Sequence, residues 1–177
     1  LKTGATANSV VNYASGSGTN TLTFNYTVAS GDTTSDLDYT ATTSLALNSG
    51  TIKDAAGNVA TLTLASPGAD YSLGLNKALV IDGNAPTVSS VTSAKTNGSY
   101  SVNDTIPISV TFTQTVAVTG TPQLTIETGA TDGVANYVSV SGATITFDYI
   151  VASGHTSGDL DYTGTSALTL NTGTIKD

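Results

Sequence analysis

Apolar and polar residues alternate with a period of two in several short stretches of the chain. Residues 21–28 have the sequence TLTFNYTV, and the alternation recurs in four other stretches, at 60–64, 106–112, 123–126 and 144–149. Successive side chains of a β-strand point to opposite faces of its sheet, so this period predicts strands with one buried face. Turn sequences such as SGSG, NSG, PGAD and TNGS separate the stretches. We therefore predict an all-β fold of antiparallel sandwiches with roughly seven strands each.

A long internal repeat lies across the chain. The sequences VASGDTTSDLDYTATTSLALNSGTIKD (28–54) and VASGHTSGDLDYTGTSALTLNTGTIKD (151–177) are separated by 123 residues and agree at 19 of 27 positions. The match continues upstream, with one gap, between VVNYASGSGTNTLTFNYT (10–27) and VANYVSVSGATITFDYI (134–150). Self-similarity of this length indicates tandem copies of one structural unit.

The repeat places both ends of the chain inside a unit. Residues 1–82 correspond to the C-terminal part of one repeat, residues 83–86 form a joint, and residues 87–177 correspond to the N-terminal part of the next. A complete unit of about 120 residues, the size of one sandwich domain, requires a copy of residues 55–82 after position 177. We therefore expect the unit at each end of this chain to be incomplete.

The charge and composition exclude several classes of function. Five Lys, no Arg and 13 acidic residues give a net charge of -8, which would repel nucleic acid and anionic lipid. No apolar run approaches the roughly 18 residues of a membrane span. Twelve of the 13 acids are Asp, with Glu127 as the exception, and Asp is favoured in turns and as a ligand for hard cations.

Three motifs resemble the tandem bacterial Ig-like repeats of very large bacterial surface adhesins. They are the DxxAP opening at residues 82–86, the DxAGN turn at residues 54–58, and the strand sequence TIxIxVTF at residues 105–112. The resemblance covers essentially the whole chain, although residues 114–116 (QTV) lack the acidic residue that often precedes the Val in such repeats. It implies an extracellular stalk module at the bacterial cell surface, with rigid joints that are often linked by calcium.

Several aspartates are candidates for binding that calcium. Asp36 and Asp38 are two positions apart, as are Asp159 and Asp161 in the repeat, so in a strand both carboxylates of a pair would lie on one face. A hard cation would reverse their mutual repulsion, but two solvated aspartates at the start of a strand are an equal alternative.

Other candidate ligands lie in turns and at the joint. Asp54, which is repeated as Asp177, begins the DxAGN motif and could bind calcium or simply close a turn. Asp82 and Asn84 lie at the joint, where the resemblance favours a shared calcium ion. Asp104 is a weaker candidate, better explained as an ordinary turn residue.

No catalytic group is indicated. Asp32 stands at the position that matches His155, so a mechanism that depends on this histidine could not operate in both units; we expect His155 to be a surface loop residue. Glu127 is matched by Lys2, which removes a paired carboxylate. We predict a structural protein, not an enzyme: spacer repeats in the stalk of an extracellular bacterial adhesin or filament, whose partners are neighbouring repeats.

Two alternatives remain open. In one, strands contributed by adjacent chains complete the units and build a head-to-tail filament. In the other, loop residues bind a glycan or a host protein, or such a ligand binds elsewhere in a longer protein.

Overall fold

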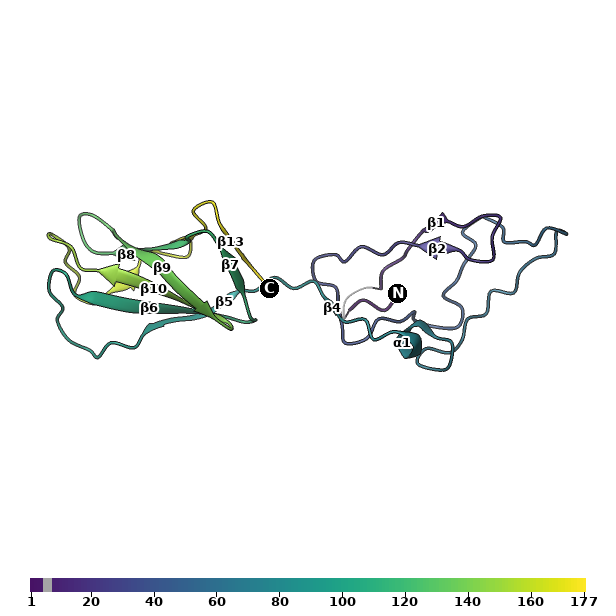
Figure 1. Ribbon diagram of the computed structural model, residues 1–177, viewed down its shortest axis with the longest axis horizontal. Helices are drawn as coiled ribbons and strands as arrows, with labels where there is room; N and C mark the ends of the chain where they lie inside the picture. Colours follow the sequence, from purple (N-terminus) through teal and green to yellow (C-terminus); the bar gives the residue numbers. More distant parts are fainter. Residues whose placement is uncertain (5–7) are drawn as a thin grey trace. The chain divides into compact units, whose positions relative to one another are not determined.

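Strands dominate the secondary structure of the protein. In the computed structural model, which describes residues 1–4 and 8–177, strands contain 32% of the residues and the α-helix 2%. The prediction of a nearly all-β chain is therefore confirmed. The chain divides into two units, Leu1–Asn84 (unit 1) and Ala85–Asp177 (unit 2), and this boundary falls within the expected joint at 83–86 (Figure 1).

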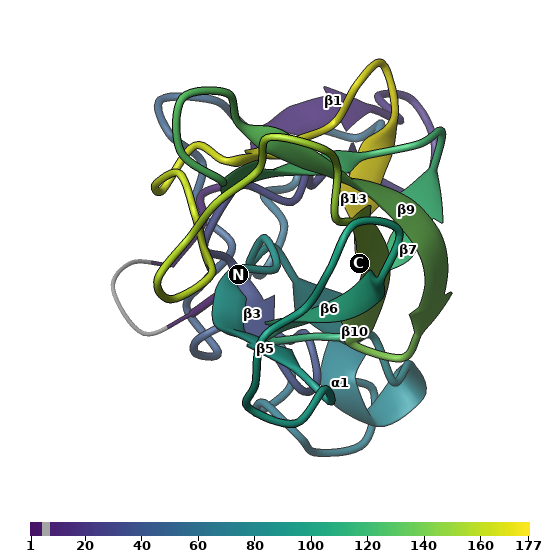
Figure 2. The ribbon, with the colours of Figure 1, turned by 90° about the vertical axis from the view of Figure 1, so that its left-hand side faces the viewer.

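Unit 2 is built on one curled antiparallel sheet. Its strands lie in the order β11-β8-β9-β10-β6-β5, with β12 also paired to β8, while β13 pairs separately with β7. The curvature is visible in the long strand β9 in Figure 2. The strands are β5 (Val88–Ser93), β6 (Thr105–Phe112), β7 (Ala117–Thr119), β8 (Gln123–Glu127), β9 (Gly133–Ser141), β10 (Thr144–Ile150), β11 (Asp161–Tyr162), β12 (Leu168–Thr169) and β13 (Thr174–Lys176).

The predicted alternation builds the core of unit 2. Along β6, β8 and β10 every second residue is buried, as the period of two requires. Strand β10 lies between β9 and β6 and pairs with both over its length. The core residues from these three strands are Ile106, Ile108, Val110, Phe112, Leu124, Ile126, Ile145, Phe147 and Tyr149.

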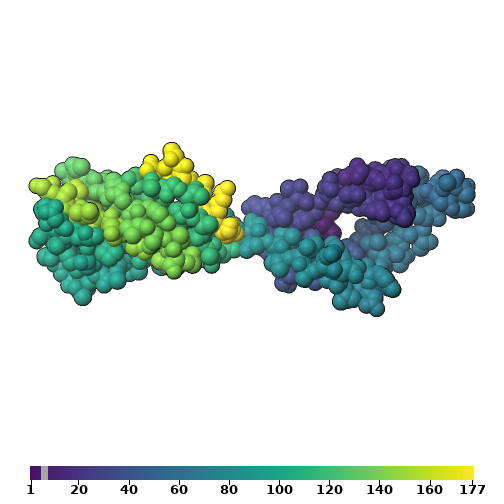
Figure 3. All heavy atoms as spheres, viewed as in Figure 1, coloured from purple at the N-terminus to yellow at the C-terminus, as the bar shows by residue number. Residues whose placement is uncertain are grey.

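Unit 1 has much less regular structure. It contains β1 (Tyr13–Ser15), β2 (Thr23–Phe24), β3 (Thr33–Thr34), the helix α1 (Leu73–Asn76) and β4 (Ile81–Asp82). Among its described residues, Leu37 is the one buried hydrophobic side chain. The space-filling view shows an opening between its N-terminal segment in purple and its later segment in teal (Figure 3).

Two of the strands predicted in unit 1 differ from expectation. The strand expected at 21–28 is reduced to Thr23–Phe24, and the stretch 60–64 forms no strand, although Ala60 N donates to Ile52 O and Leu64 N donates to Thr42 O. The physical reason lies in the missing neighbours. The matching strand β10 of unit 2 is held from one side by β6, and the described residues of unit 1 (1–4 and 8–84) contain no counterpart of β6.

Each unit nevertheless contains a copy of the same hairpin. In unit 1, β1 pairs with β2 with the partners Tyr13↔Phe24 and Ser15↔Thr23, and the register shifts between them. In unit 2, β9 pairs with β10 with the partners Tyr137↔Phe147 and Ser139↔Thr146, and the register shifts at the same place. The Tyr and Phe rings meet edge to face in both, with centroids 6.3 Å and 6.4 Å apart. The sequence repeat is thus also a repeat of strand register.

Candidate functional site

Among the described residues, Asp36 and Asp38 are the candidate ligands whose carboxylates meet a common neighbour. A Cβ atom placed on Gly74 would lie 2.9 Å from Asp38 Oδ2 and 3.3 Å from Asp36 Oδ2. Gly74 lies in α1, whose first turn is capped by the buried side chain of Ser72. A side chain at this position would crowd the two carboxylates, and Asp38 would have to shift to accommodate it.

Backbone amides, rather than a strand face, hold these two carboxylates. Asp38 Oδ1 accepts a hydrogen bond from Tyr39 N at 2.8 Å, and its Oδ2 accepts one from Gly68 N at 3.0 Å. Asp36 Oδ1 accepts from Leu79 N at 3.4 Å. Neither aspartate lies in a strand, so the reason given for their pairing is wrong, and Asp38 is buried instead of solvated.

The matching pair in unit 2 is more open. Asp161 begins β11 and is exposed, and its Oδ1 accepts a hydrogen bond from Tyr162 N at 2.8 Å. Asp159 is also exposed and precedes the strand, so this pair does not share a strand face either. Residues 85–177 contain no counterpart of Gly68, Gly74 or Leu79, the residues that surround the carboxylates in unit 1.

Asp54 closes its own turn. Its Oδ1 accepts hydrogen bonds from Ala56 N at 3.0 Å and Asn58 N at 2.8 Å, and its Oδ2 accepts one from Asn58 Nδ2 at 2.8 Å. These bonds, above all those from Asn58, hold the pKa of the Asp54 carboxyl below its usual value. Gly57 has φ +94°, a conformation that favours glycine. The DxAGN motif therefore forms the turn that was one of its two expected roles, and the corresponding Asp177 lies exposed just after β13.

The remaining candidates also contact backbone amides. Asp82 Oδ1 accepts a hydrogen bond from Asn84 N at 3.1 Å, which places these two joint residues together at the end of β4. Asp104 Oδ2 accepts from Ser101 N at 2.6 Å just before β6, as expected of a turn residue. Within residues 1–4 and 8–177 no three His, Cys, Asp or Glu side chains form a group that could hold a metal ion.

A tyrosine contacts the side chain six residues after it at matching positions of the two units, and the sequence analysis did not predict this contact. Tyr26 Oη donates to Asp32 Oδ2 at 2.6 Å, and in unit 2 Tyr149 Oη lies 2.8 Å from His155 Nδ1. The His155 ring also stacks on Tyr149, with centroids 6.0 Å apart and planes 6° apart. His155 lies in the loop between β10 and β11, as expected, but it is half-buried because its ring contacts Tyr149. The signal was available: a Tyr stands six residues before the variable position in both copies.

The two partners of the unit 1 pair shift each other's pKa in opposite directions. Burial and then the Asp32 carboxylate raise the pKa of Tyr26 to about 12. The hydrogen bond from Tyr26, followed by the one from Ala29 N, lowers the pKa of Asp32. The pair therefore favours a neutral phenol that donates to an ionised carboxylate.

Comparisons with models of known families, with curated proteins and with solved structures give no match. In the part of the chain that the structure describes, no helix is long and apolar enough to cross a membrane.

Proposed function

We propose that the chain is a stretch of tandem Ig-like β-sandwich repeats that acts as a structural spacer in the stalk of an extracellular bacterial surface adhesin. The observation that carries the proposal is the strand register shared by β1–β2 and β9–β10, with its shift at the same place. A repeat whose copies have the same strand register and the same turns suits a role in which each unit adds length to the protein. The resemblance of the joint and turn motifs to adhesin repeats supplies the cellular setting.

The short joint and the net charge would both support a spacer role. The joint is short, and Pro86 restricts its backbone. The net charge of -8 makes neighbouring stalks repel each other. A mechanical role of this kind requires no reacting group.

Calcium belongs to the same proposal, at the joint residues Asp82 and Asn84. Their carboxylate and amide oxygens match the ligands that calcium prefers, and no soft ligand is present because the chain contains no Cys. Bound calcium would supply a fixed positive charge that neutralises these oxygens. The carboxylates of Asp36 and Asp38 are a second candidate donor set within unit 1.

An in-frame array tests the spacer role. Residues 55–177 span one complete repeat period, so the chain can be extended by two, three or four copies of this block. We expect the maximum dimension of the array, measured by small-angle X-ray scattering, to increase by a constant amount per block. An array whose maximum dimension stays the same as blocks are added would refute the spacer role.

Calcium is tested separately by thermal unfolding. A site filled only in the folded state stabilises it by RT ln(1 + [L]/Kd), about 2.7 kcal/mol at 100 times Kd. We expect a higher melting temperature in millimolar calcium than in EGTA, with the difference lost in Asp82→Ala and kept in Asp70→Ala as the matched control. An identical melting temperature in both buffers would remove calcium from the proposal.

A further inference from the structure

The loop between β5 and β6 has an exposed Asn–Gly pair at its tip. Residues 97–99 have the sequence NGS, the one Asn–Gly sequence in the chain, and all three are exposed. The base of this tip is closed by a hydrogen bond from Tyr100 Oη to Thr96 O. The pair therefore lies in a short segment that is held at its two ends while its own groups face water.

The side-chain amide of Asn97 and the backbone nitrogen of Gly98 can approach each other without breaking a contact. In the described part of the chain (1–4 and 8–177), no hydrogen bond engages the Asn97 side chain or the Gly98 N–H. A Cβ atom placed on Gly98 would meet no atom within 4 Å, so the residue is surrounded by open space. Glycine also has wide conformational freedom, which allows its nitrogen to turn toward the preceding side chain.

We propose that Asn97 is a site of spontaneous deamidation in the folded protein. The Gly98 nitrogen loses its proton to solvent and attacks Cγ of Asn97, the side-chain nitrogen leaves as ammonia, and a five-membered succinimide ring forms. Water then opens the ring at one of its two carbonyl carbons. Opening at Cγ gives aspartate with the main chain unchanged, and opening at the backbone carbonyl gives isoaspartate, whose main chain passes through Cγ. The net reaction consumes one water and releases one ammonia.

A related sequence at the joint is protected by the fold. Asp82 is followed by Gly83, and an aspartate in this position can form the same ring with loss of water. Gly83 N, however, donates a hydrogen bond to Asp32 O at 2.7 Å. Because the attacking nitrogen is already engaged, ring formation at this site requires that hydrogen bond to break first.

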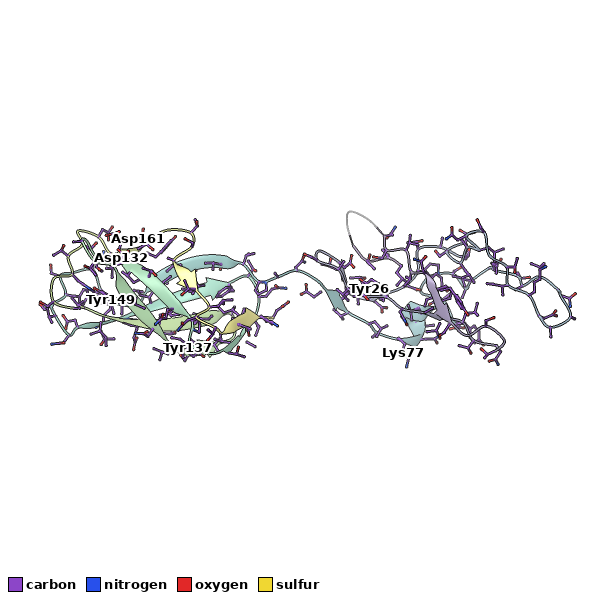
Figure 4. All side chains as sticks on the ribbon, turned by 90° about the horizontal axis from the view of Figure 1, so that it is seen from above. Tyr26, Lys77, Asp132, Tyr137, Tyr149 and Asp161 are labelled. Carbon is purple, nitrogen blue, oxygen red and sulfur yellow. The ribbon has the colours of Figure 1, made fainter. Side chains whose placement is uncertain are left out.

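An asparagine of unit 1 shows the same protection. Asn76 is the last residue of α1 and is followed by Lys77 (Figure 4). Lys77 N donates to Leu73 O at 2.9 Å, which closes the end of the helix. The nitrogen that would attack Asn76 is therefore held in place, so this residue is a control for Asn97 within the same chain.

Deamidation changes the charge and the backbone of the loop. Either product adds one negative charge to the net charge of -8. The new carboxylate lies two residues from Lys95, whose Nζ sits 5.5 Å from the centroid of the Tyr100 ring. The loop lies outside the paired strands, so the core of unit 2 does not have to change. Because ammonia is lost, the converted fraction increases with the age of the protein, whatever the role of the chain as a spacer.

Incubation of the purified full chain tests the proposal. Trypsin cleaves after Lys95 and chymotrypsin after Tyr100, which releases residues 96–100 with Asn97 as their one asparagine. Mass spectrometry follows the replacement of the amide NH₂ by OH, and electron-transfer fragmentation distinguishes isoaspartate from aspartate. We expect first-order conversion to both products, faster at mildly alkaline than at weakly acidic pH because the attacking nitrogen must lose its proton. Asn76 should stay intact over the same period.

Two glycine substitutions show whether the geometry at Gly98 sets the rate. Gly98→Ala keeps the N–H group but restricts the backbone, and it should slow conversion roughly ten-fold or more. Gly158→Ala is the matched control, because a Cβ atom placed on this exposed loop glycine also meets no atom within 4 Å. It should leave the rate at Asn97 unchanged.

The synthetic peptide of residues 96–100 gives the rate without the fold. We expect the folded chain to convert at a similar rate. An Asn97 that stays intact in the folded chain while the peptide converts would overturn the proposal, since the loop would then hold the pair apart. Conversion that Gly98→Ala does not slow, or that is as fast at Asn76 as at Asn97, would overturn it as well. None of these results bears on the length of in-frame arrays, so this inference and the spacer role fail separately.

Discussion

The hairpin β1–β2 and the hairpin β9–β10 have related sequences and the same register but very different burial. Phe24 is 41% exposed, whereas the matching Phe147 is fully buried. The difference lies in what the rest of each unit supplies: β6 packs its apolar face into the core beside Phe147, and the part of unit 1 that the structure describes contains no such strand. Local sequence is thus enough to set the pairing of a hairpin, but its burial depends on strands from elsewhere in the repeat.

The burial of the matching carboxylates of Asp38 and Asp161 differs in the opposite direction. Asp38 is buried under segment 65–82, whereas Asp161 is exposed in a unit without that segment. Unit 1 has the later part of the repeat, which covers Asp38, and unit 2 has the earlier part, which covers Phe147. The two parts of the repeat therefore bury different side chains.

The largest test of this comparison is the removal of the two matching phenylalanines. Phe147→Ala should lower the free energy of unfolding of unit 2 by about 3–5 kcal/mol, the usual cost of emptying a buried aromatic site. Phe24→Ala should cost less than about 1 kcal/mol, because its ring is already largely in water. Urea unfolding followed by circular dichroism measures both. Equal costs would show that the unit 1 hairpin is buried in solution by something that residues 1–84 do not supply.

Some of the fold and of the site could be predicted from sequence. The alternation at 106–112, 123–126 and 144–149 predicted strands that the structure contains, because in unit 2 each has a neighbour on which to bury its apolar face. The strand predicted from the same pattern at 60–64 is absent. Alternation indicates which face of a strand would be buried, but not whether a neighbouring strand is there to pair with it. The turn at Asp54 was foreseen because its contacts are local.

The contacts that could not be foreseen are those between distant residues. Asp38 accepts from Gly68, 30 residues away, and nothing in the spacing of Asp36 and Asp38 indicates that amide. The contact of Tyr149 with His155 was overlooked because the change from Asp32 to His155 suggested an unconstrained position. Asp and His can both accept a hydrogen bond from a phenol, so the change keeps the contact while it alters the charge.

Substituting the two matching aspartates should change the free energy of unfolding by less than substituting the phenylalanines. Asp38→Ala should lower the free energy of unfolding of unit 1 by about 1–3 kcal/mol, because it leaves the amide of Gly68 without its acceptor in a buried site. Asp161→Ala should change the stability of the isolated chain by no more than about 0.5 kcal/mol, since its carboxylate is exposed. The measurement is urea unfolding at a concentration where the chain is monomeric. A large loss in Asp161→Ala would show that the carboxylate is already covered in the monomer.

The smallest effect concerns pH and the pair Tyr26–Asp32. The pKa of Asp32 is lowered in the folded state, so its ionised form stabilises unit 1 above the usual pKa of about 4. This contribution is lost as the pH falls through the lowered value. The pKa of Tyr26 is raised to about 12, so its contribution is complete below pH 10 and is lost as the pH rises toward 12. Unit 1 should therefore lose stability both in acid, below the usual pKa of Asp, and at alkaline pH, as the pH rises from 10 toward 12.

Carbon-detected NMR titration of the Asp32 carboxyl group measures the acid side of this prediction. Tyr26→Phe removes the hydrogen bond that lowers the pKa of Asp32 most, so the midpoint should rise toward its ordinary value. Tyr13→Phe is the matched control, because the Tyr13 hydroxyl accepts from Ser17 N and does not contact Asp32. Absorbance at alkaline pH gives the other side: Asp32→Asn should lower the pKa of Tyr26 only in part, since burial is the larger cause of its shift. An Asp32 midpoint that stays the same in Tyr26→Phe would mean that the two side chains do not meet in solution, and the parallel with Tyr149 and His155 would then fail.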